Sequence, residues 1–535
     1  MYLFYVLFFC FVSGGVIKND LFPLNIVHYN DFHARFEETS VNYPVCKVND
    51  TSCLGGFPRL YQEIKTLLKQ YPDALLLNAG DVYQGTYWYT FFKWNVTVEF
   101  INMLPNDAHA IGNHEFDDSI VGLVPYLQRL KGPVLAANLD TSLEPSLSGL
   151  YKPHVVVERH GRKIGIIGLI TTSTKTSSNP GEVIFLDPIP IVQREAQLLT
   201  DQGVDIIIVL SHCGLDVDIQ IAKTVGENID VIVGGHTHSL LWNGTSPSNE
   251  TISGPYPITV EHENGHKVLI VTASAFTKYL GNITVYFDAS GNVQMFDATP
   301  IFLNRSIPED PEIKNLLQPY SQYIHNMIEE VIGKSNDYLP DEGCASQECA
   351  IGNLVADAFL EESRLKKPSN LTTVALLVRN NVRASLPKGD IIRGAVINIL
   401  PFTNNVVSFE IRGKYILEAL KHCIEPYWNI HPYAGPLLPQ VSGLRVALNT
   451  TEPRQVVSVE VKEGDQYKPL QMEQMYQVVT LDFLRRGRSG FKMFKDHGKN
   501  SMSHRKDAVV VENYIKAITP ITPSDLIQNR LIIMN

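Results

Sequence analysis

The 535-residue chain has no excess of positive charge: 45 Lys and Arg residues stand against 56 Asp and Glu residues, for a net charge of −11. A nucleic-acid-binding surface needs clustered basic residues, so this balance argues against that class of function. Charged residues make up only 19% of the chain and hydrophobic residues 44%, which excludes an intrinsically disordered protein. Internal repeats and low-complexity segments are also missing. We therefore expect packed globular domains, and the length allows two to four of them.

Long apolar runs are missing after the first residues of the chain. Residues 1–15 are almost wholly apolar and end in small residues, which is typical of a secretory signal peptide. The run is shorter than the ~20 residues of a membrane-spanning helix. The last residues lack the spacer and long apolar tail of a lipid-anchor signal. We therefore expect a secreted, extracellular, soluble monomer without a membrane anchor.

Cysteine is scarce, with seven residues in the chain, and its spacing fits an oxidising compartment. Cys46 with Cys53, and Cys344 with Cys349, are close pairs that could each close a small disulfide loop. Cys213 is interpreted as a buried free thiol. Asn-x-Ser/Thr sequons support export as a glycoprotein. They lie at Asn49, Asn95, Asn243, Asn249, Asn282, Asn304, Asn370 and Asn449.

Strand and helix patterns divide the chain into two α/β regions. Strands are predicted at Lys163–Thr171, Lys267–Ala273, Val374–Val378, Val406–Ile411, Val457–Val461 and Tyr476–Leu481, and helices at Leu60–Gln70, Ile189–Gly203, Pro311–Ile332 and Lys414–His422. After the signal peptide, we predict a first domain at 22–305, a linker helix at 306–336 and a second domain at 337–535. Sites between two domains are common places for ligands.

Five short polar segments occur in the first 240 residues, and most of them directly follow an apolar run. They are Asp31-Phe32-His33, Gly80-Asp81, Gly112-Asn113-His114-Glu115, Ser211-His212 and Gly235-His236-Thr237-His238. Buried strands that end at one edge of a sheet would bring these carboxylates, imidazoles and one amide together. Such ligands suit Zn²⁺, Mn²⁺ or Ca²⁺, and no thiolate is required. One segment alone reads as an ordinary polar loop, but the five together predict a metal centre.

The candidate ligands are numerous enough for two metal ions if one carboxylate is shared. They are Asp31, His33, Asp81, Asn113, His212, His236 and His238. Asp81 is the natural bridge, since it is the only carboxylate on its loop close to a strand end. Two ions about 3.5–4 Å apart can clamp the attacking and leaving oxygens of a phosphoryl transfer and lower the pKa of a bound water.

These segments carry a resemblance. The ligand set is similar to the metallophosphoesterase core, and Asn113-His114-Glu115-Phe116-Asp117 and Gly352-Asn353-Leu354 resemble the 5'-nucleotidase family. Phe32-His33-Ala34-Arg35-Phe36-Glu37-Glu38 and Ser211-His212-Cys213 look most like secreted salivary apyrases of blood-feeding arthropods. The resemblance covers nearly the whole mature chain. It implies an α/β fold with an N-terminal metallophosphoesterase sandwich, a linker helix and a C-terminal 5'-nucleotidase-type substrate domain.

The resemblance also implies roles for individual residues. One divalent ion would take Asp31, His33, Asp81 and His238, and the other would take Asp81, Asn113, His212 and His236. Related enzymes often have an amide where this chain has His238, so zinc is favoured here, with calcium, magnesium or manganese as alternatives. His114, as an imidazolium, would stabilise the transferring phosphoryl group, and Asp117 would orient it. Alternatively, Asp117 is a carboxylate that stabilises a helix N-terminus.

In the second domain, the resemblance implies an aromatic sandwich around the nucleotide base and arginines on the phosphates. Phe402 and Phe483 match the two aromatic residues, although either could simply pack in the core. Arg383 matches a phosphate-binding arginine, whose planar guanidinium meets phosphate oxygens in pairs.

Three positions of the second domain depart from the family pattern. Ala345 stands where an arginine is usual, Val378 replaces a polar base-contacting residue, and Ser489 replaces the aspartate that binds the ribose. One lost charge-assisted hydrogen bond costs about 1.5–3 kcal/mol. Together, the three changes would remove most nucleotide binding unless other groups compensate.

Four arginines near the same loops are candidates for compensation. They are Arg379, Arg485, Arg486 and Arg488. Our hypothesis is that some of them shift the preference of the pocket toward ATP and ADP over AMP. The alternative is a solvated basic surface.

The sequence leaves three functions open. The first is a secreted, metal-dependent nucleotide phosphohydrolase, in which water activated between two metals attacks the terminal phosphate of ATP, ADP or AMP and His114 and Asp117 assist. Removal of extracellular ADP and ATP would suppress platelet signalling in a blood feeder. The second is a secreted protein that binds a host haemostatic protein, for example by the Arg485–Ser489 loop. The third is a phosphoesterase for other esters, such as cyclic nucleotides or sugar nucleotides. Retention of the metal ligands favours an enzyme, whereas the altered pocket favours a binding protein.

Overall fold

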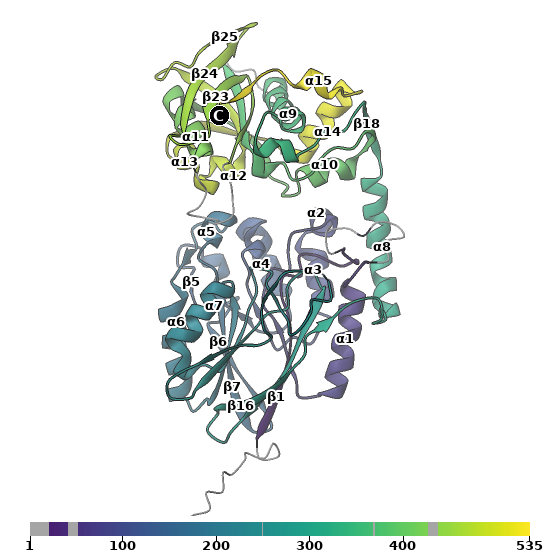
Figure 1. Cartoon of the computed structure of the whole chain (residues 1–535), viewed down its shortest axis with the longest axis vertical. Coiled ribbons are helices and arrows are strands. Elements are labelled where there is room, and N and C mark those ends of the chain that lie inside the picture. Colours follow the sequence, from purple (N-terminus) through teal and green to yellow (C-terminus); the bar gives the residue numbers. More distant parts are fainter. Residues whose placement is uncertain are drawn as a thin grey trace, which may run out of the picture.

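The computed structural model describes residues 21–40, 46, 52–248, 250–366, 370–425 and 437–534. The predicted signal peptide and the sequons at Asn49 and Asn249 lie outside these residues. The chain forms two lobes, with the N-terminal half in the lower one and the C-terminal half in the upper one (Figure 1). None of the helices in the described part combines the length and the apolar character that crossing a bilayer requires.

The first sheet of the lower lobe has the order β16-β15-β1-β2-β3-β4, and β17 pairs with β15. Its strands are β1 (Phe22–Tyr29), β2 (Leu75–Asn78), β3 (Ala108–Ala110), β4 (Val134–Leu135), β15 (Tyr279–Phe287), β16 (Val293–Ala298) and β17 (Ile301–Phe302). Strands β1 to β4 run parallel, and β15 and β16 add an antiparallel edge. The carboxyl ends of the four parallel strands therefore lie along one edge of the sheet.

The second sheet has the order β13-β14-β10-β9-β7-β6 and a parallel centre as well. Its strands are β6 (His154–Arg159), β7 (Arg162–Ile170), β9 (Ile206–His212), β10 (Val231–Val233), β13 (Ile258–Glu261) and β14 (Lys267–Val271). Two short pairs accompany the sheets, β5 (Leu139–Asp140) with β8 (Ile184–Phe185) and β11 (Leu240–Leu241) with β12 (Ile252–Gly254).

The two sheets pack face to face, and helices cover their outer faces. On β9, Ile206 and Ile208 point into the core between the sheets, whereas Ile207 and Val209 pack with the outer helices. Both faces of the strand are buried, which explains its continuous apolar sequence. The helices of this lobe are α1 (Phe57–Gln70), α2 (Tyr87–Phe92), α3 (Trp94–Ile101), α4 (Ser119–Arg129), α5 (Thr174–Ser177), α6 (Pro188–Asp201) and α7 (Leu215–Val225).

The upper lobe contains a five-stranded sheet, β22-β19-β26-β21-β27, and a four-stranded sheet, β25-β24-β23-β28, while β18 pairs with β20. The strands are β18 (Val331–Ser335), β19 (Thr373–Val378), β20 (Gly389–Ile392), β21 (Asn405–Arg412), β22 (Pro439–Ser442), β23 (Leu444–Asn449), β24 (Gln455–Glu463), β25 (Gln466–Pro469), β26 (Met475–Leu481), β27 (Lys499–Lys506) and β28 (Leu531–Met534). The helices are α9 (Ala350–Lys366), α10 (Arg393–Ile399), α11 (Gly413–Ile424), α12 (Asp482–Arg485), α13 (Lys492–His497), α14 (Asp507–Ile518) and α15 (Pro523–Leu526). The structure confirms the mixed α/β class for both lobes.

The helix between the lobes is shorter than predicted. Helix α8 spans Pro311–Ile328 and runs along the side of the molecule toward the upper lobe (Figure 1). The predicted helix at Pro311–Ile332 is wrong in its last residues, because β18 begins at Val331 and pairs with β20. Apolar residues such as Ile332 continue the helical spacing in sequence, but the pairing with β20 decides their backbone conformation.

Candidate active site

Each predicted metal ligand follows the carboxyl end of a parallel strand, and both sheets contribute. Asp31 and His33 follow β1, Asp81 follows β2, Asn113 follows β3, His212 ends β9, and His236 and His238 follow β10. Five of these residues have a left-handed backbone, with φ between 48° and 76°: Asp31, His33, Asp81, His236 and His238. Such a conformation costs about 1–3 kcal/mol for a residue other than glycine and is concentrated at functional sites. The loops are therefore bent sharply where they present these side chains.

Asp31, His33 and His238 form the first cluster, with their ligand atoms within 4.8 Å of one another. The Nε2 atoms of His33 and His238 are 3.1 Å apart, and His238 Nε2 is 3.3 Å from Asp31 Oδ1. His33 Nδ1 donates to the backbone carbonyl of Gln84 at 3.0 Å. This bond leaves Nε2 as the coordinating atom, which is the usual arrangement of a ligating histidine.

Asp81, His212 and His236 form the second cluster. His212 Nδ1 donates to the Ala79 carbonyl at 2.7 Å, and its Nε2 lies 3.0 Å from Asp81 Oδ2. The same Asp81 oxygen is 3.8 Å from His33 Nε2, so this carboxylate lies beside both clusters. The structure thus places Asp81 between the two predicted ligand sets.

A buried polar atom supports the fit of this site to cations. Asn113 Oδ1 is buried without a hydrogen-bond partner. A buried polar atom without a partner costs about 1–3 kcal/mol. Coordination of a divalent ion would satisfy this oxygen, and carboxylate, imidazole and amide donors suit such ions.

Three of these side chains already have the protonation state that metal binding needs. Burial raises the pKa of Asp31, but His238 and His212 outweigh it and lower the pKa to about 2. Burial lowers the pKa of His33 to about 3 and that of His236 to about 4. Coordination requires ionised carboxylates and neutral imidazoles, so these three groups need no proton change.

His212 differs from the other imidazoles. Burial disfavours its charge, but Asp81 outweighs this effect and raises the pKa of His212 to about 9. Without an ion, His212 and Asp81 therefore form a buried ion pair. A metal ion that uses His212 Nε2 must displace this proton.

His114 and Asp117 form a pair beside the two clusters. His114 Nδ1 and Asp117 Oδ2 are 2.6 Å apart, and burial of His114 is outweighed by Asp117 and Asp81, which raise its pKa to about 10. Ser178 Oγ donates to Asp117 Oδ1 at 2.7 Å, and the Asn179 amide donates to the Asp117 carbonyl at 3.1 Å. The pair is thus held from both sides. The sequence gives no sign of Ser178, because it is 61 residues from Asp117 and belongs to no motif.

Glu115 organises the loop that carries Asp81. One of its oxygens accepts the backbone N–H groups of Gly112 and Asp81, and the other accepts those of Val82 and Tyr83. The side chain is only 2% exposed. Glu115 belongs to the predicted motif Asn113-His114-Glu115-Phe116-Asp117. Its place in the sequence does not reveal that its side chain accepts four backbone N–H groups. Glu115 therefore acts on the metal site through Asp81 rather than as a ligand.

We expect Glu115→Gln to weaken metal binding about 10–100-fold, the usual effect of losing an outer-sphere contact. A glutamine has only one acceptor oxygen, so two of the four N–H groups would face its NH₂ group instead. Zinc affinity can be measured by competition with a chromophoric chelator. Glu158→Gln, on the exposed side of β6, is the matched control. Equal zinc affinity in wild type and Glu115→Gln would contradict the positioning role.

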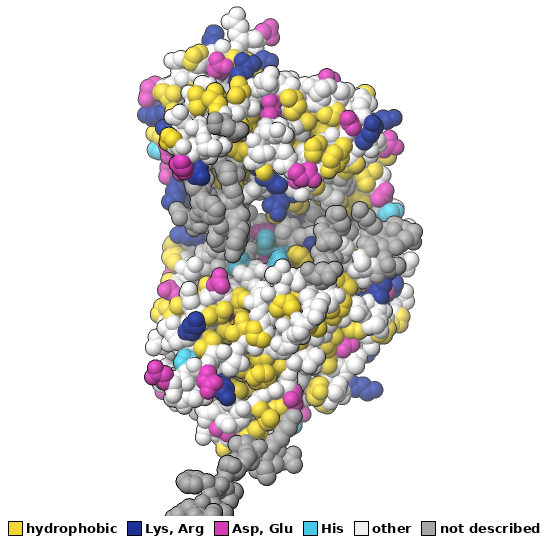
Figure 2. All heavy atoms as spheres, in the orientation of Figure 1, with side chains coloured by type: hydrophobic (Ala, Val, Ile, Leu, Met, Phe, Trp, Pro, Cys, Tyr) yellow, Lys and Arg dark blue, Asp and Glu magenta, His cyan; other side chains and the backbone are white. Residues whose placement is uncertain are grey.

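A cavity of about 180 Å³ lies between the two lobes. It connects the His114–Asp117 pair with the predicted nucleotide-binding residues. Its lining includes His114 and Asp117 from the lower lobe and Arg383, Phe402, Phe483 and Ser489 from the upper lobe. Basic side chains and histidines lie in the hollow between the lobes (Figure 2). Phe402 is 39% exposed, and its ring centre lies 5.8 Å from the Arg383 guanidinium carbon. Neither Arg383 nor the two aromatic residues is therefore confined to the core.

Two of the three atypical positions lie outside the lining of this cavity. Val378 is buried in the core beside α11, because alternate residues of β19 point to opposite faces of the sheet. Ala345 is exposed on the loop closed by Cys344 and Cys349. In the described structure, only Ser489 of the three contributes to the lining.

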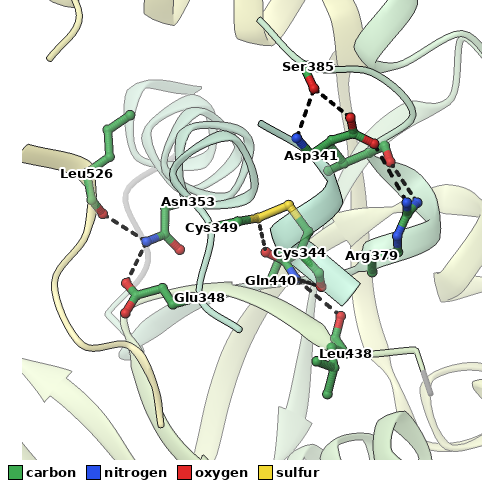
Figure 3. The surroundings of a disulfide bond; sticks show 11 residues. Asp341, Cys344, Glu348, Cys349, Asn353, Arg379, Ser385, Leu438, Gln440 and Leu526 are labelled. Atoms are coloured by element: carbon green, nitrogen blue, oxygen red, sulfur yellow. Dashed lines mark hydrogen bonds and ion pairs between the residues drawn. A yellow bond between two sulfur atoms is a disulfide. The ribbon is translucent and has the colours of Figure 1, made fainter. Parts of the chain in front are cut away.

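The loop with Ala345 is held by its disulfide and by polar contacts at its base (Figure 3). Asp341 accepts a hydrogen bond from Ser385 at 2.6 Å and lies 3.6 Å from the Arg379 guanidinium. Gln440 Nε2 donates to the Cys344 carbonyl at 3.4 Å. The predicted pairs Cys46–Cys53 and Cys344–Cys349 are both confirmed as disulfides, and Cys213 is a buried free thiol.

The four extra arginines have different surroundings. Arg485 donates to the carbonyls of Phe494 and Gly498 and to Ser501, so all three of its guanidinium nitrogens already have hydrogen-bond partners. Arg379 is tethered to Asp341, and Arg486 lies 3.4 Å from Asp482. Arg488 belongs to a 3₁₀ turn, Arg488–Gly490, that packs against α5 across the lobes. The Arg485–Ser489 loop is therefore partly covered.

Comparisons with known proteins point to the same chemistry. Residues 24–240 match the family model of calcineurin-like phosphoesterases, and residues 331–496 match the C-terminal domain of 5'-nucleotidases. An apyrase of Tabanus yao is 42% identical over 94% of this chain and 92% of its own length. A 5'-nucleotidase of Bos taurus is 35% identical over 94% of this chain and 89% of its own length.

A solved structure extends the similarity to the whole fold. The crystal structure of a 5'-nucleotidase precursor from Thermus thermophilus has a TM-score of 0.75 and 34% identity, and the match covers 96% of this chain and all of that one. The fold and the clustered ligands define a metal-dependent phosphoester hydrolase with two domains. More particularly, the chain belongs to the 5'-nucleotidase family, which includes apyrases as well as 5'-nucleotidases among its relatives. These relatives support nucleotide phosphohydrolase activity.

Proposed function

We propose that this protein is a secreted enzyme that hydrolyses extracellular ATP and ADP, with AMP as a further substrate. The observation that carries the proposal is the single cavity lined by His114, Asp117, Arg383, Phe402 and Phe483. It places a charge-stabilising pair and a nucleotide-sized set of aromatic and basic groups in one space. The high identity to an apyrase and to a 5'-nucleotidase supports the same substrate class.

Two divalent ions, with zinc favoured, complete the proposed site. One would be held by Asp31, His33, Asp81 and His238, and the other by Asp81, Asn113, His212 and His236. When bound, such ions supply positive charge that polarises a phosphate and lowers the pKa of water. The chain contributes the rigid loops that hold these side chains at one edge of the sheets.

His114 is proposed to stabilise the transferring phosphoryl group. Its Nδ1 faces Asp117 at 2.6 Å, so Nε2 is the nitrogen left to donate to a phosphate oxygen. A preorganised, charged donor in a site shielded from water stabilises developing negative charge more strongly than water does. Asp117 orients the ring, and Ser178 in turn orients Asp117.

Phe402 and Phe483 are proposed to stack on the base, and Arg383 to bind a phosphate of the substrate. Aromatic rings tolerate any base, since every base offers a π face. The Arg383 guanidinium lies at the cavity and offers paired donors to phosphate oxygens. Because Ala345 and Val378 lie outside the cavity, polar recognition would fall to other lining side chains such as Asn380 and Asn404.

Outside cells, this activity would remove ADP and ATP that signal to platelets, which fits a protein from a blood feeder. Export is expected from the apolar segment at residues 1–15 and from the sequons. A soluble, glycosylated monomer is proposed.

The test is phosphate release from ATP, ADP and AMP by the purified protein, with Zn²⁺, Ca²⁺ or Mg²⁺ added. We expect release from ADP and ATP, and we expect a chelator to abolish it and Zn²⁺ to restore it. Folded, metal-loaded protein that releases no phosphate from any nucleotide would overturn the proposal. That outcome would favour the alternative, a binding protein for a host haemostatic factor, since Val378 and Ala345 supply no polar group to the cavity.

A further inference from the structure

A second cavity adjoins the nucleotide cavity between the two lobes. It has a volume of about 120 Å³, and five residues line both cavities: Gln84, Asp117, Asn179, Phe402 and Asn404. The second cavity, called the side chamber below, is also lined by Lys93, Arg486 and Lys506. Because Asp117 and Phe402 lie in both walls, a ligand in the side chamber would be next to the catalytic pair and to the proposed base site.

Lys93 and Lys506 reach the side chamber from opposite lobes and meet at Thr403. Lys93 lies at the junction of α2 and α3, and its Nζ donates to Thr403 Oγ1 at 3.1 Å. Lys506 is the last residue of β27, and its Nζ donates to the Thr403 carbonyl at 2.9 Å. Thr403 directly follows Phe402, so both ammonium groups lie beside the loop that carries this ring.

Two carboxylates of the side chamber are already occupied by other partners. Asp117 contacts His114 through one oxygen and accepts from Ser178 through the other. Asp482 has an oxygen 3.4 Å from the Arg486 guanidinium. Neither carboxylate forms an ion pair with either lysine, although Asp117 is close enough to raise the pKa of Lys93.

The two lysines have only loose contacts with carboxylates. Lys93 lies 3.9 Å from Asp118. Within the described ranges, no carboxylate lies within 4.0 Å of Lys506. Burial lowers the pKa of Lys93 and the neighbouring charge of Lys506 lowers it further, whereas Asp118, Asp117 and Asp507 oppose this shift. Two like charges that repel each other across a cavity favour an anion between them.

We propose that the side chamber is a phosphate subsite, which holds a phosphate of a nucleoside diphosphate or triphosphate other than the one being cleaved. The subsite rests on the nucleotide binding that the proposed function requires, because its place beside Asp117 matters only if a nucleotide occupies the first cavity. Lysine ammonium groups bind phosphate as compact point charges, and the flexible stems let them follow a phosphate chain. A nucleoside monophosphate has no second phosphate to place there. Lys93 and Lys506, which belong to no sequence motif, would therefore set the preference of the enzyme for ADP and ATP over AMP.

The test compares Lys506→Met with wild type, using steady-state kinetics with ADP and with AMP. Lys506 is exposed, so the variant should fold, and its melting temperature checks this. We expect KM for ADP to rise about tenfold, as for the loss of one charge-assisted hydrogen bond, and the ADP-to-AMP ratio of kcat/KM to fall by a similar factor. Lys93→Met should move the same ratio in the same direction. Lys468→Met in β25 is the matched control, because Lys468 forms an ion pair with Glu463 at the end of β24.

Binding separates failure of the subsite from failure of the proposed function. Calorimetry on the intact protein can compare AMP with an ADP analogue whose phosphates are joined by a methylene group. Weaker binding of the analogue by Lys506→Met supports the subsite, even if wild type hydrolyses no nucleotide and the proposed function fails. If wild type hydrolyses ADP while both lysine variants keep the wild-type KM for ADP and affinity for the analogue, the proposed function stands and the subsite is overturned.

Discussion

Asp81→Ala is expected to lower the rate of nucleotide hydrolysis at least about a thousandfold. The carboxylate lies beside both clusters, 3.0 Å from His212 Nε2 and 3.8 Å from His33 Nε2. Removal of one group that stabilises a transition state electrostatically costs about 10²–10³ in rate. Asp81 would serve two ions at once, so its loss should exceed that range.

The number of metal ions bound per chain shows whether the Asp81 variant is inactive because it has lost metal. We expect elemental analysis to find fewer bound ions per chain in Asp81→Ala than in wild type. Asp230→Ala is the matched control, because Asp230 is also buried and accepts the Ile207 N–H at 2.8 Å at the far end of the same β9–β10 pair. If Asp81→Ala kept both its ions and its activity, the bridging role would be refuted.

The second large effect is expected for His114→Gln, which should lower kcat about 10²–10³-fold and leave metal content unchanged. Glutamine is similar in reach to histidine but carries no charge, so the developing charge on the phosphate loses its charged donor. Steady-state kinetics with ADP measure the loss, and elemental analysis of the same sample measures the metal. The result would separate a catalytic group from a ligand.

This separation is needed because His114 lies close to possible ligands. One ring nitrogen of His114, one ring nitrogen of His33 and one carboxylate oxygen of Asp81 lie within 4.8 Å of one another. A variant that loses one ion together with its activity would show that His114 coordinates metal. His154→Gln is the control: His154 is also paired with a carboxylate, Glu195 at 2.8 Å, but it lies on β6 away from the cavity.

Sequence patterns predicted the secondary structure best where strands are buried on both faces. The runs Ile206–Leu210 and Val374–Val378 are apolar without interruption because both faces meet hydrophobic neighbours. Such runs need no information from distant residues. The end of α8 could not be predicted in this way, since β18 becomes a strand by pairing with β20, a segment distant in the sequence.

The candidate metal site was predictable because its ligands follow strands that end at the same edge. Their roles remain predictions, but the structure brings six of the seven predicted ligands into two adjoining clusters, and the seventh, Asn113, has a buried side-chain oxygen without a partner. The supporting groups were not predictable to the same degree. Ser178 reaches Asp117 only because α5 packs beside that loop, and Glu115 binds four backbone N–H groups on two separate loops.

The sequence by itself determined the two α/β domains, the ligand types and the family, because hydrophobic periodicity and short motifs are local properties of the chain. Only the tertiary structure decided which charges face the ligand. Arg485, which stands next to a predicted binding loop, donates to backbone carbonyls instead. Lys93 and Lys506, which lie in different lobes, meet at one threonine. The use of a charged side chain depends on what the fold packs against it, and that partner is usually distant in sequence.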